Sequence, residues 1–127
     1  MRSILAPGER PLFWVGSSKK ALLAMPAPVI RVIGMALDVA QLGGTDPSSK
    51  PWKGQGAGVF EIVENFDGNT FRAVYTVKFR KALYVLHCFQ KKSPRGIKTA
   101  KVDVDLVAKR LRAAQNDYEA RYGKESS

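Results

Sequence analysis

A chain of 127 residues fits a single domain, and its hydrophobic fraction of 45% excludes wholesale disorder. Lys and Arg number 21 against 11 Asp and Glu, so the formal net charge is +10. A charge of that size indicates polyanionic partners, such as nucleic acid, a ribosome surface or an anionic membrane. Residues 91–101 (KKSPRGIKTAK) hold five cations and no carboxylate, which favours a phosphate-contacting strip over a solvated basic loop; its RNA-binding candidates are Lys91, Arg95 and Lys98.

Several classes of protein are excluded by what the chain lacks. Cys88 is its one cysteine and His87 its one histidine, so a disulfide framework, a zinc site and a Ser-His-Asp triad are not expected. Cys88 lies in an apolar run and is interpreted as a small core residue. No run of about 18 apolar residues could span a membrane, and the N-terminal apolar stretch is too short for a signal peptide. We therefore expect a cytoplasmic protein with no membrane partner and no metal.

The first third of the chain predicts a short strand and a helical hairpin. Residues 1–11 read as an irregular arm and 12–15 as a strand. Ser17 or Ser18 is placed to cap a helix over 19–25 that a proline ends.

A second helix is predicted to begin near Pro28 and to end at Gly43-Gly44. Its apolar residues recur at spacings of three and four, which indicates one buried face made of Ile30, Ile33, Leu37 and Ala40.

Residues 45–58 are rich in Gly, Pro and Ser and predict a loop. Lys50, Trp52 and Lys53 project from it. An aromatic ring between two cations suits RNA, because the ring can stack on a base while the lysines contact phosphates. The alternative is that Trp52 anchors the loop to the core, and the sequence leaves both open.

Three strands and a helix follow. Asp67-Gly68 lies between the strand-like runs 59–65 and 70–79 and predicts a hairpin. The run 82–90 is almost wholly apolar, which is typical of a strand covered on both faces. The last helix is expected over 103–122, with a core stripe of Val107, Leu111, Ala114 and Tyr118, and with Lys109, Arg110 and Arg112 on its other faces.

The predicted order is β-α-α-β-β-β-α, an α+β fold. A helical hairpin precedes a β-meander, and one helix follows it. The whole chain, 1–127, is interpreted as one domain with an arm at 1–11 and a tail at 123–127.

RNA cleavage by attack of a 2′-OH on its own phosphate needs a proton acceptor, a proton donor and cations around the phosphorane. In a hairpin with a two-residue loop, opposed residue numbers sum to an odd total, so Glu61 shares a face with Arg72 while Tyr75 points to the other face. The two are then diagonal or near neighbours. They form either a cross-strand ion pair or a proton acceptor steered by a cation.

His87 has two interpretations. A histidine in an apolar strand is most often a satisfied core residue. His87 also lies four residues before Lys91, where the basic strip begins, and a neutral imidazole there could hand over a proton near pH 7.

Two stretches, KPWKGQGAGVFEIVENFDGNTFRAVYTVKF and ALYVLHCFQKKSPRGIKT, resemble the phage-derived branch of the RelE/HigB toxin superfamily, as does the opening PLFWVGSSKKAL. The likeness covers roughly residues 11–122. It implies a RelE-like mixed sheet and the toxin of a type II toxin–antitoxin pair. Such a toxin is a ribosome-dependent, metal-independent endoribonuclease that cuts mRNA in the A site and inhibits translation. It has no organic cofactor, and a cognate helix-turn-helix antitoxin silences it.

The resemblance also implies site residues. Arg72 falls where these toxins keep an arginine that contacts the scissile phosphate. Lys91 and Lys92 fall where they keep basic residues at the end of the next strand, and Lys50 and Lys53 lie in the basic loop before the meander.

One departure concerns proton transfer. Members of the RelE type carry lysines on the strand before the arginine, whereas Glu61 and Val63 stand at the corresponding positions. Glu61 could replace a lysine as the base, or the ribosome could supply the missing group. The expected catalytic set is Arg72, Lys92, Glu61 and His87.

Two other functions stay open. ParE-like toxins share the implied fold but bind DNA gyrase without catalysis, and the lack of an obvious acid–base set would suit such a protein. The third possibility is a non-catalytic RNA-binding module, which would bind RNA in a salt-sensitive way without cleaving it.

Overall fold

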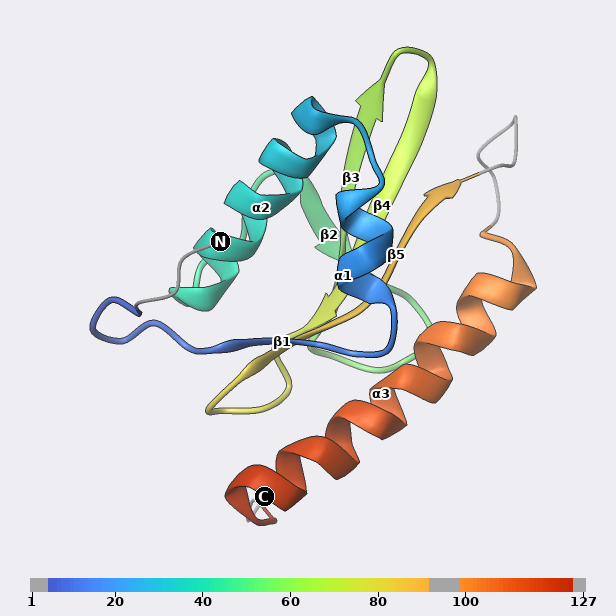
Figure 1. Cartoon of the computed structure of the whole chain (residues 1–127). Helices are drawn as coiled ribbons and strands as arrows, with labels where there is room; N and C mark the ends of the chain where they lie inside the picture. Colours follow the sequence, from blue (N-terminus) through green and yellow to red (C-terminus); the bar gives the residue numbers. More distant parts are fainter. Residues whose placement is uncertain (1–4, 92–98, 125–127) are drawn as a thin grey trace.

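The computed structural model describes residues 5–91 and 99–124, and it confirms an α+β fold (Figure 1). The elements are β1 (Leu12–Trp14), α1 (Ser18–Leu23), α2 (Ala27–Gln41), β2 (Ser49–Pro51), β3 (Val59–Phe66), β4 (Asn69–Thr76), β5 (Leu83–Lys91) and α3 (Lys101–Tyr122). The helical hairpin, the meander β3–β5 and the C-terminal helix follow one another as the sequence predicts. None of the helices in the described ranges is long and apolar enough to cross a membrane.

The sheet has the strand order β1-β5-β4-β3-β2, in which β1 is parallel to β5 and the other pairs are antiparallel. The apolar strand β5 therefore lies inside the sheet, as expected. The prediction of a loop over 45–58 was wrong at its centre, because Ser49–Pro51 pairs with Phe60–Ile62 as a short edge strand. A proline is tolerated there, since an edge strand leaves one row of backbone groups unpaired.

The two faces of the sheet carry two separate cores. One core packs α1 and α2 against one face, through Leu22, Ile33 and Leu37 on the helices and alternate strand residues that include Ile62 and Tyr75. The other core packs α3 against the opposite face; it contains Val59, Val74, Leu86, Val107 and Tyr118. Because successive strand residues point to opposite faces, the strands β1, β3, β4 and β5 each contribute side chains to both cores.

The hairpin turn fixes the register of the meander. Asp67 and Gly68 have φ of 52° and 79°, the left-handed backbone that a two-residue turn of type I′ requires at both positions. The strands then pair so that Glu61 lies opposite Val74. The strand predicted to reach residue 79 ends at Thr76, where the backbone turns and Val77 N–H donates to the Gly58 carbonyl at 2.8 Å.

The first helix begins without the side-chain cap that its serines predict. Ser17 stands at the cap position but makes no capping hydrogen bond there. Ser18 is buried, and its hydroxyl donates to the Val85 carbonyl at 3.2 Å. Ser18 therefore ties α1 to β5, and neither serine caps the N-terminus of α1 through its side chain.

Candidate functional site

Four charged side chains gather on the face of the sheet that α3 partly covers. Lys50 on β2 lies directly opposite Glu61 on β3, so their side chains share a face. Arg72 on β4 is diagonal to Glu61 and bonds to it, and Lys91 ends β5 opposite Thr70. We call Lys50, Glu61, Arg72 and Lys91 the Arg72 cluster.

Arg72 and Glu61 form a buried ion pair at the centre of this cluster. Each residue is 8% exposed, and Arg72 Nη1 donates to Glu61 Oε1. The hairpin parity predicted that the two would be neighbours, and the structure confirms it. Arg72 Nε is also buried but finds no hydrogen-bond partner among the described residues. One buried donor of the guanidinium is thus unsatisfied within the described part of the chain.

The pKa of Lys91 is shifted by the charges of the other members of the cluster. Burial lowers the pKa of Lys91, and the positive charges of Arg72 and Lys50 lower it further, while the carboxylate of Glu61 raises it. Charges shift the pKa of a neighbouring group only over short distances, because solvent and salt screen them over longer distances. Three cations and one carboxylate make the cluster positively charged, which suits a phosphodiester.

Trp52 does not extend this surface. It is 5% exposed and belongs to the core beneath α3, with Val59 and Val74. The structure therefore places it as the anchoring alternative requires, and its ring has no free face on which a base could stack. Lys53 follows it in the loop and is exposed. The predicted contacts Lys92, Arg95 and Lys98 lie outside the described residues.

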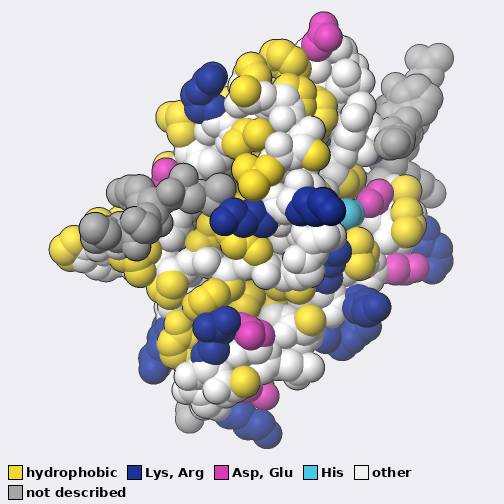
Figure 2. Space-filling model, in the orientation of Figure 1, with side chains coloured by type: hydrophobic (Ala, Val, Ile, Leu, Met, Phe, Trp, Pro, Cys, Tyr) yellow, Lys and Arg dark blue, Asp and Glu magenta, His cyan; other side chains and the backbone are white. Residues whose placement is uncertain are grey.

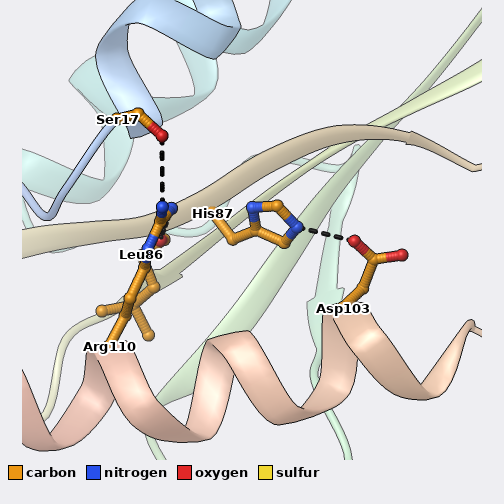
Figure 3. Close-up of polar contacts among 5 residues, drawn as sticks. All are labelled: Ser17, Leu86, His87, Asp103 and Arg110. Carbon is orange, nitrogen blue, oxygen red and sulfur yellow. Dashed lines mark hydrogen bonds and ion pairs between the residues drawn. The ribbon is translucent and has the colours of Figure 1, made fainter.

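His87 faces α3, and Asp103 at the start of that helix holds its ring (Figure 3). The distance from Nε2 to Asp103 Oδ1 is 2.7 Å. The other nitrogen, Nδ1, is buried without a partner in the described part of the chain, and the ring stacks on Phe89 with centroids 4.6 Å apart. One ring nitrogen is paired with Asp103 and the other is buried, so the geometry fits the core interpretation of His87. Its part in proton transfer stays a prediction.

Asp103 is a residue of this site that the sequence reasoning did not single out. A carboxylate in the first turn of α3 was visible in the sequence, but its pairing with β5 depends on how the helix crosses the sheet. The contact between Asp103 Oδ1 and His87 Nε2 fixes the orientation of the imidazole ring. The pair therefore locks the beginning of α3 next to the strand that ends in Lys91.

The position of Arg110 differs from the expectation, because it lies between α3 and the sheet rather than on an outer face of the helix (Figure 3). Its Nη1 donates to the Leu86 carbonyl at 2.9 Å and its Nη2 to Ser17 Oγ at 3.2 Å. Leu86 is the residue that the β4–β5 register skips, a bulge that leaves backbone groups outside the ladder. Gly16 lies so close that a Cβ there would be 3.0 Å from Arg110 Nη2. Arg110 thus clamps α3, β5 and the start of α1 together.

Cys88 lies on the opposite face of β5 and is buried, as expected of a core residue. Burial raises the pKa of its thiol to about 12, so it remains a neutral thiol near pH 7. Across residues 5–91 and 99–124, no group of three or more His, Cys, Asp or Glu side chains is arranged to hold a metal ion.

Comparison with models of protein families finds a match. The family model described as "Phage derived protein Gp49-like (DUF891)" matches residues 20–112, well over half of the chain and the whole of the sheet apart from β1. No curated protein and no solved structure matches significantly. The matched range contains all four residues of the Arg72 cluster and both residues that fasten α3 to β5.

Proposed function

The chain belongs to the Gp49-like family of phage-derived proteins, a family associated with toxin–antitoxin systems. We propose that it is the toxin of a type II pair and that it belongs to a branch of the RelE/HigB superfamily. In this proposal the protein is a ribosome-dependent endoribonuclease that cuts mRNA in the A site. A helix-turn-helix antitoxin, encoded next to it, silences it. The resemblance of the meander to that superfamily supports the proposal, as does the α+β order of the elements.

The observation that carries the proposal is the Arg72 cluster. It joins an arginine with an unpartnered donor to a carboxylate that can accept a proton, and two lysines flank the pair. These are the groups that cleavage through a phosphorane needs in the absence of a metal. A surface built only to hold RNA would gain nothing from a carboxylate among its phosphate contacts.

The reaction follows from these groups. The scissile phosphate competes with Glu61 for the guanidinium of Arg72. Glu61, released from the ion pair, accepts the proton of the 2′-OH as the O2′–P bond forms.

Arg72 and Lys50 stabilise the charge of the phosphorane. When the P–O5′ bond breaks, the leaving oxygen takes a proton from Lys91, whose lowered pKa makes it the better acid, or from its neighbour Lys92. The products are a 2′,3′-cyclic phosphate and a 5′-hydroxyl.

The experiment combines purified ribosomes, mRNA and the protein, with cleavage read by primer extension. Arg72→Gln should lower the rate by on the order of 100-fold, because one preorganised cation of the transition state is removed. Since this change leaves Glu61 buried without its cation, it also costs stability. The double variant Glu61→Gln with Arg72→Gln removes both charges together and should be inactive yet folded.

Arg112→Gln is the matched control, because Arg112 is exposed on α3 away from the cluster. It removes the same charge and should leave cleavage unchanged. Failure to cut in the A site at saturating wild-type protein would sink the enzymatic claim. Cleaved chromosomal DNA with intact mRNA would instead identify a gyrase toxin, and salt-sensitive RNA binding without cleavage would identify a binding module.

A further inference from the structure

The outer face of α2 carries large apolar side chains that nothing in the described chain covers. Met35, Val39 and Leu42 follow at spacings of four and three, so they lie on one side of the helix. They are 62%, 37% and 56% exposed. The opposite side of the same helix is fully buried through Ile33 and Leu37. Arg31 and Asp38 lie on the same side as Met35, so this side of the helix presents large apolar side chains next to two charges.

The apolar surface continues toward α1. Leu23, at the end of α1, is 54% exposed, and the connection into α2 exposes Ala24, Ala27 and Pro28. Figure 2 shows hydrophobic side chains gathered over α1 and α2, with Lys and Arg side chains at the border of this region. We call the exposed side chains of Leu23, Met35, Val39 and Leu42 the outer α2 face. An apolar patch with a charged border marks an interaction site.

The charge around this patch identifies the kind of partner. Lys19, Lys20 and Arg31 are exposed on α1 and α2, and between residues 18 and 42 Asp38 is the one carboxylate. A second copy of this chain would bring the same cations and a net charge of +10 against them, and that opposes self-association. A segment with an apolar stripe and acidic flanks meets both the apolar and the charged part of the surface.

The outer α2 face lies on the side of the sheet away from the Arg72 cluster. α1 and α2 pack on the face that contains Ile62 and Tyr75, while Glu61 and Arg72 point to the face that α3 covers. Figure 1 shows the two helices on one side of the sheet and α3 separate from them. A partner bound at α2 would therefore leave the cluster itself uncovered.

We propose that the outer α2 face binds an amphipathic helix with acidic flanks, contributed by the antitoxin, at a site remote from the catalytic residues. This rests on the proposed function for the identity of the partner. The antitoxin then projects from the side of the sheet that α1 and α2 cover. Its bulk neutralises the toxin by preventing it from binding to the ribosome. The Arg72 cluster stays accessible to small RNA ligands in the complex.

The probe is the protein encoded by the open reading frame adjacent to the gene for this chain, purified and titrated by calorimetry. The double variant Met35→Glu with Leu42→Glu should weaken binding by at least tenfold, because it puts carboxylates into the apolar stripe. Both side chains are more than half exposed, so the thermal unfolding midpoint should stay within a few degrees of the wild type. Val102→Glu is the matched control: Val102 is 71% exposed on α3, and its replacement should not alter binding.

Oxidation of methionine supplies a direct footprint. Peroxide should oxidise Met35, which is exposed, readily in the free protein and slowly in the complex. Protection of Met35 in the isolated protein, together with the mass of a dimer by light scattering, would mean that a second copy covers the face. That result would overturn the choice of partner.

The outcome separates this inference from the proposed function. The Met35–Leu42 double variant should still inhibit growth but escape rescue by the neighbouring protein. Tight binding that ignores both substitutions and leaves Met35 unprotected would overturn the docking site while leaving the toxin intact. Absence of any binding by the neighbouring protein would overturn it as well. A wild-type chain that binds the neighbour through α2 but never inhibits growth would contradict the toxin and not the docking site.

Discussion

Arg72 and Glu61 make a costly contact for a protein of this size. Both groups are almost completely removed from water, and a buried ion pair commonly contributes little net stability after desolvation. The pair is also incomplete, since Arg72 Nε has no partner in the described residues. An unsatisfied donor on a buried cation costs stability. Hairpin parity alone predicts that the two side chains are neighbours, but it does not predict that they are buried.

At this scale the pKa of Lys91 tests whether the cluster exists in solution. Glu61→Gln removes the carboxylate that raises this pKa, so the pKa should fall. Arg72→Gln removes a cation that lowers it, so the pKa should rise. An NMR titration of the side-chain carbon next to Nζ measures both shifts, with Lys101 as an internal reference because its pKa is raised by Asp105 instead. Equal pKa values in all three proteins would show that Lys91 lies too far from the pair.

At the scale of elements, α3 is the part whose attachment matters most for the site. Val107, Ala114 and Tyr118 pack in its core, as its periodicity predicts. The polar fastening through Arg110 and Asp103 was not predictable, because it depends on the bulge in β5 and on where the helix crosses the sheet. The short strand β2 escaped detection for a related reason. Three residues without alternating hydrophobicity become a strand only when a partner strand lies beside them.

Arg110→Met keeps the aliphatic stem of this residue and removes its two hydrogen bonds. The bulge carbonyl of Leu86 then loses its cationic donor, so the free energy of unfolding should fall by about 1.5–3 kcal/mol. Arg112→Met, on the exposed side of the same helix, should change it by no more than about 0.5 kcal/mol. Urea denaturation followed by circular dichroism measures both. Equal losses in the two variants would contradict the clamp.

At the scale of the whole molecule, the sheet separates two surfaces with different chemistry. The face beneath α3 carries the Arg72 cluster, and the face beneath α1 and α2 supports the apolar outer α2 face. The net charge of +10 predicts affinity for RNA anywhere on the protein, whereas the proposed function predicts that RNA binds at the Arg72 cluster. Salt dependence can distinguish the two situations, because each phosphate that the protein neutralises releases counterions.

Replacing Lys50 and Lys91 by Gln should make the salt dependence of affinity for single-stranded RNA shallower, by about 0.7 in the log–log slope for each phosphate that the variant no longer neutralises. Replacing Lys109 and Arg112 by Gln removes the same charge from the exposed side of α3. That control should leave the slope nearly unchanged. Fluorescence anisotropy at a series of salt concentrations provides the measurement. Identical slopes for the two double variants would mean that RNA binds through diffuse charge.

The sequence by itself determined the fold class, the order of the main elements and the neighbourhood of Glu61 and Arg72. Those features follow from local rules: apolar periodicity, turn residues at Asp67-Gly68, and the alternation of side chains along paired strands. Only the tertiary structure decided that Trp52 is a core anchor, that Arg110 turns inward and that α2 keeps an uncovered apolar side. Each of these depends on which distant element lies against the residue. That is set by packing between segments far apart in the chain, which local patterns do not encode.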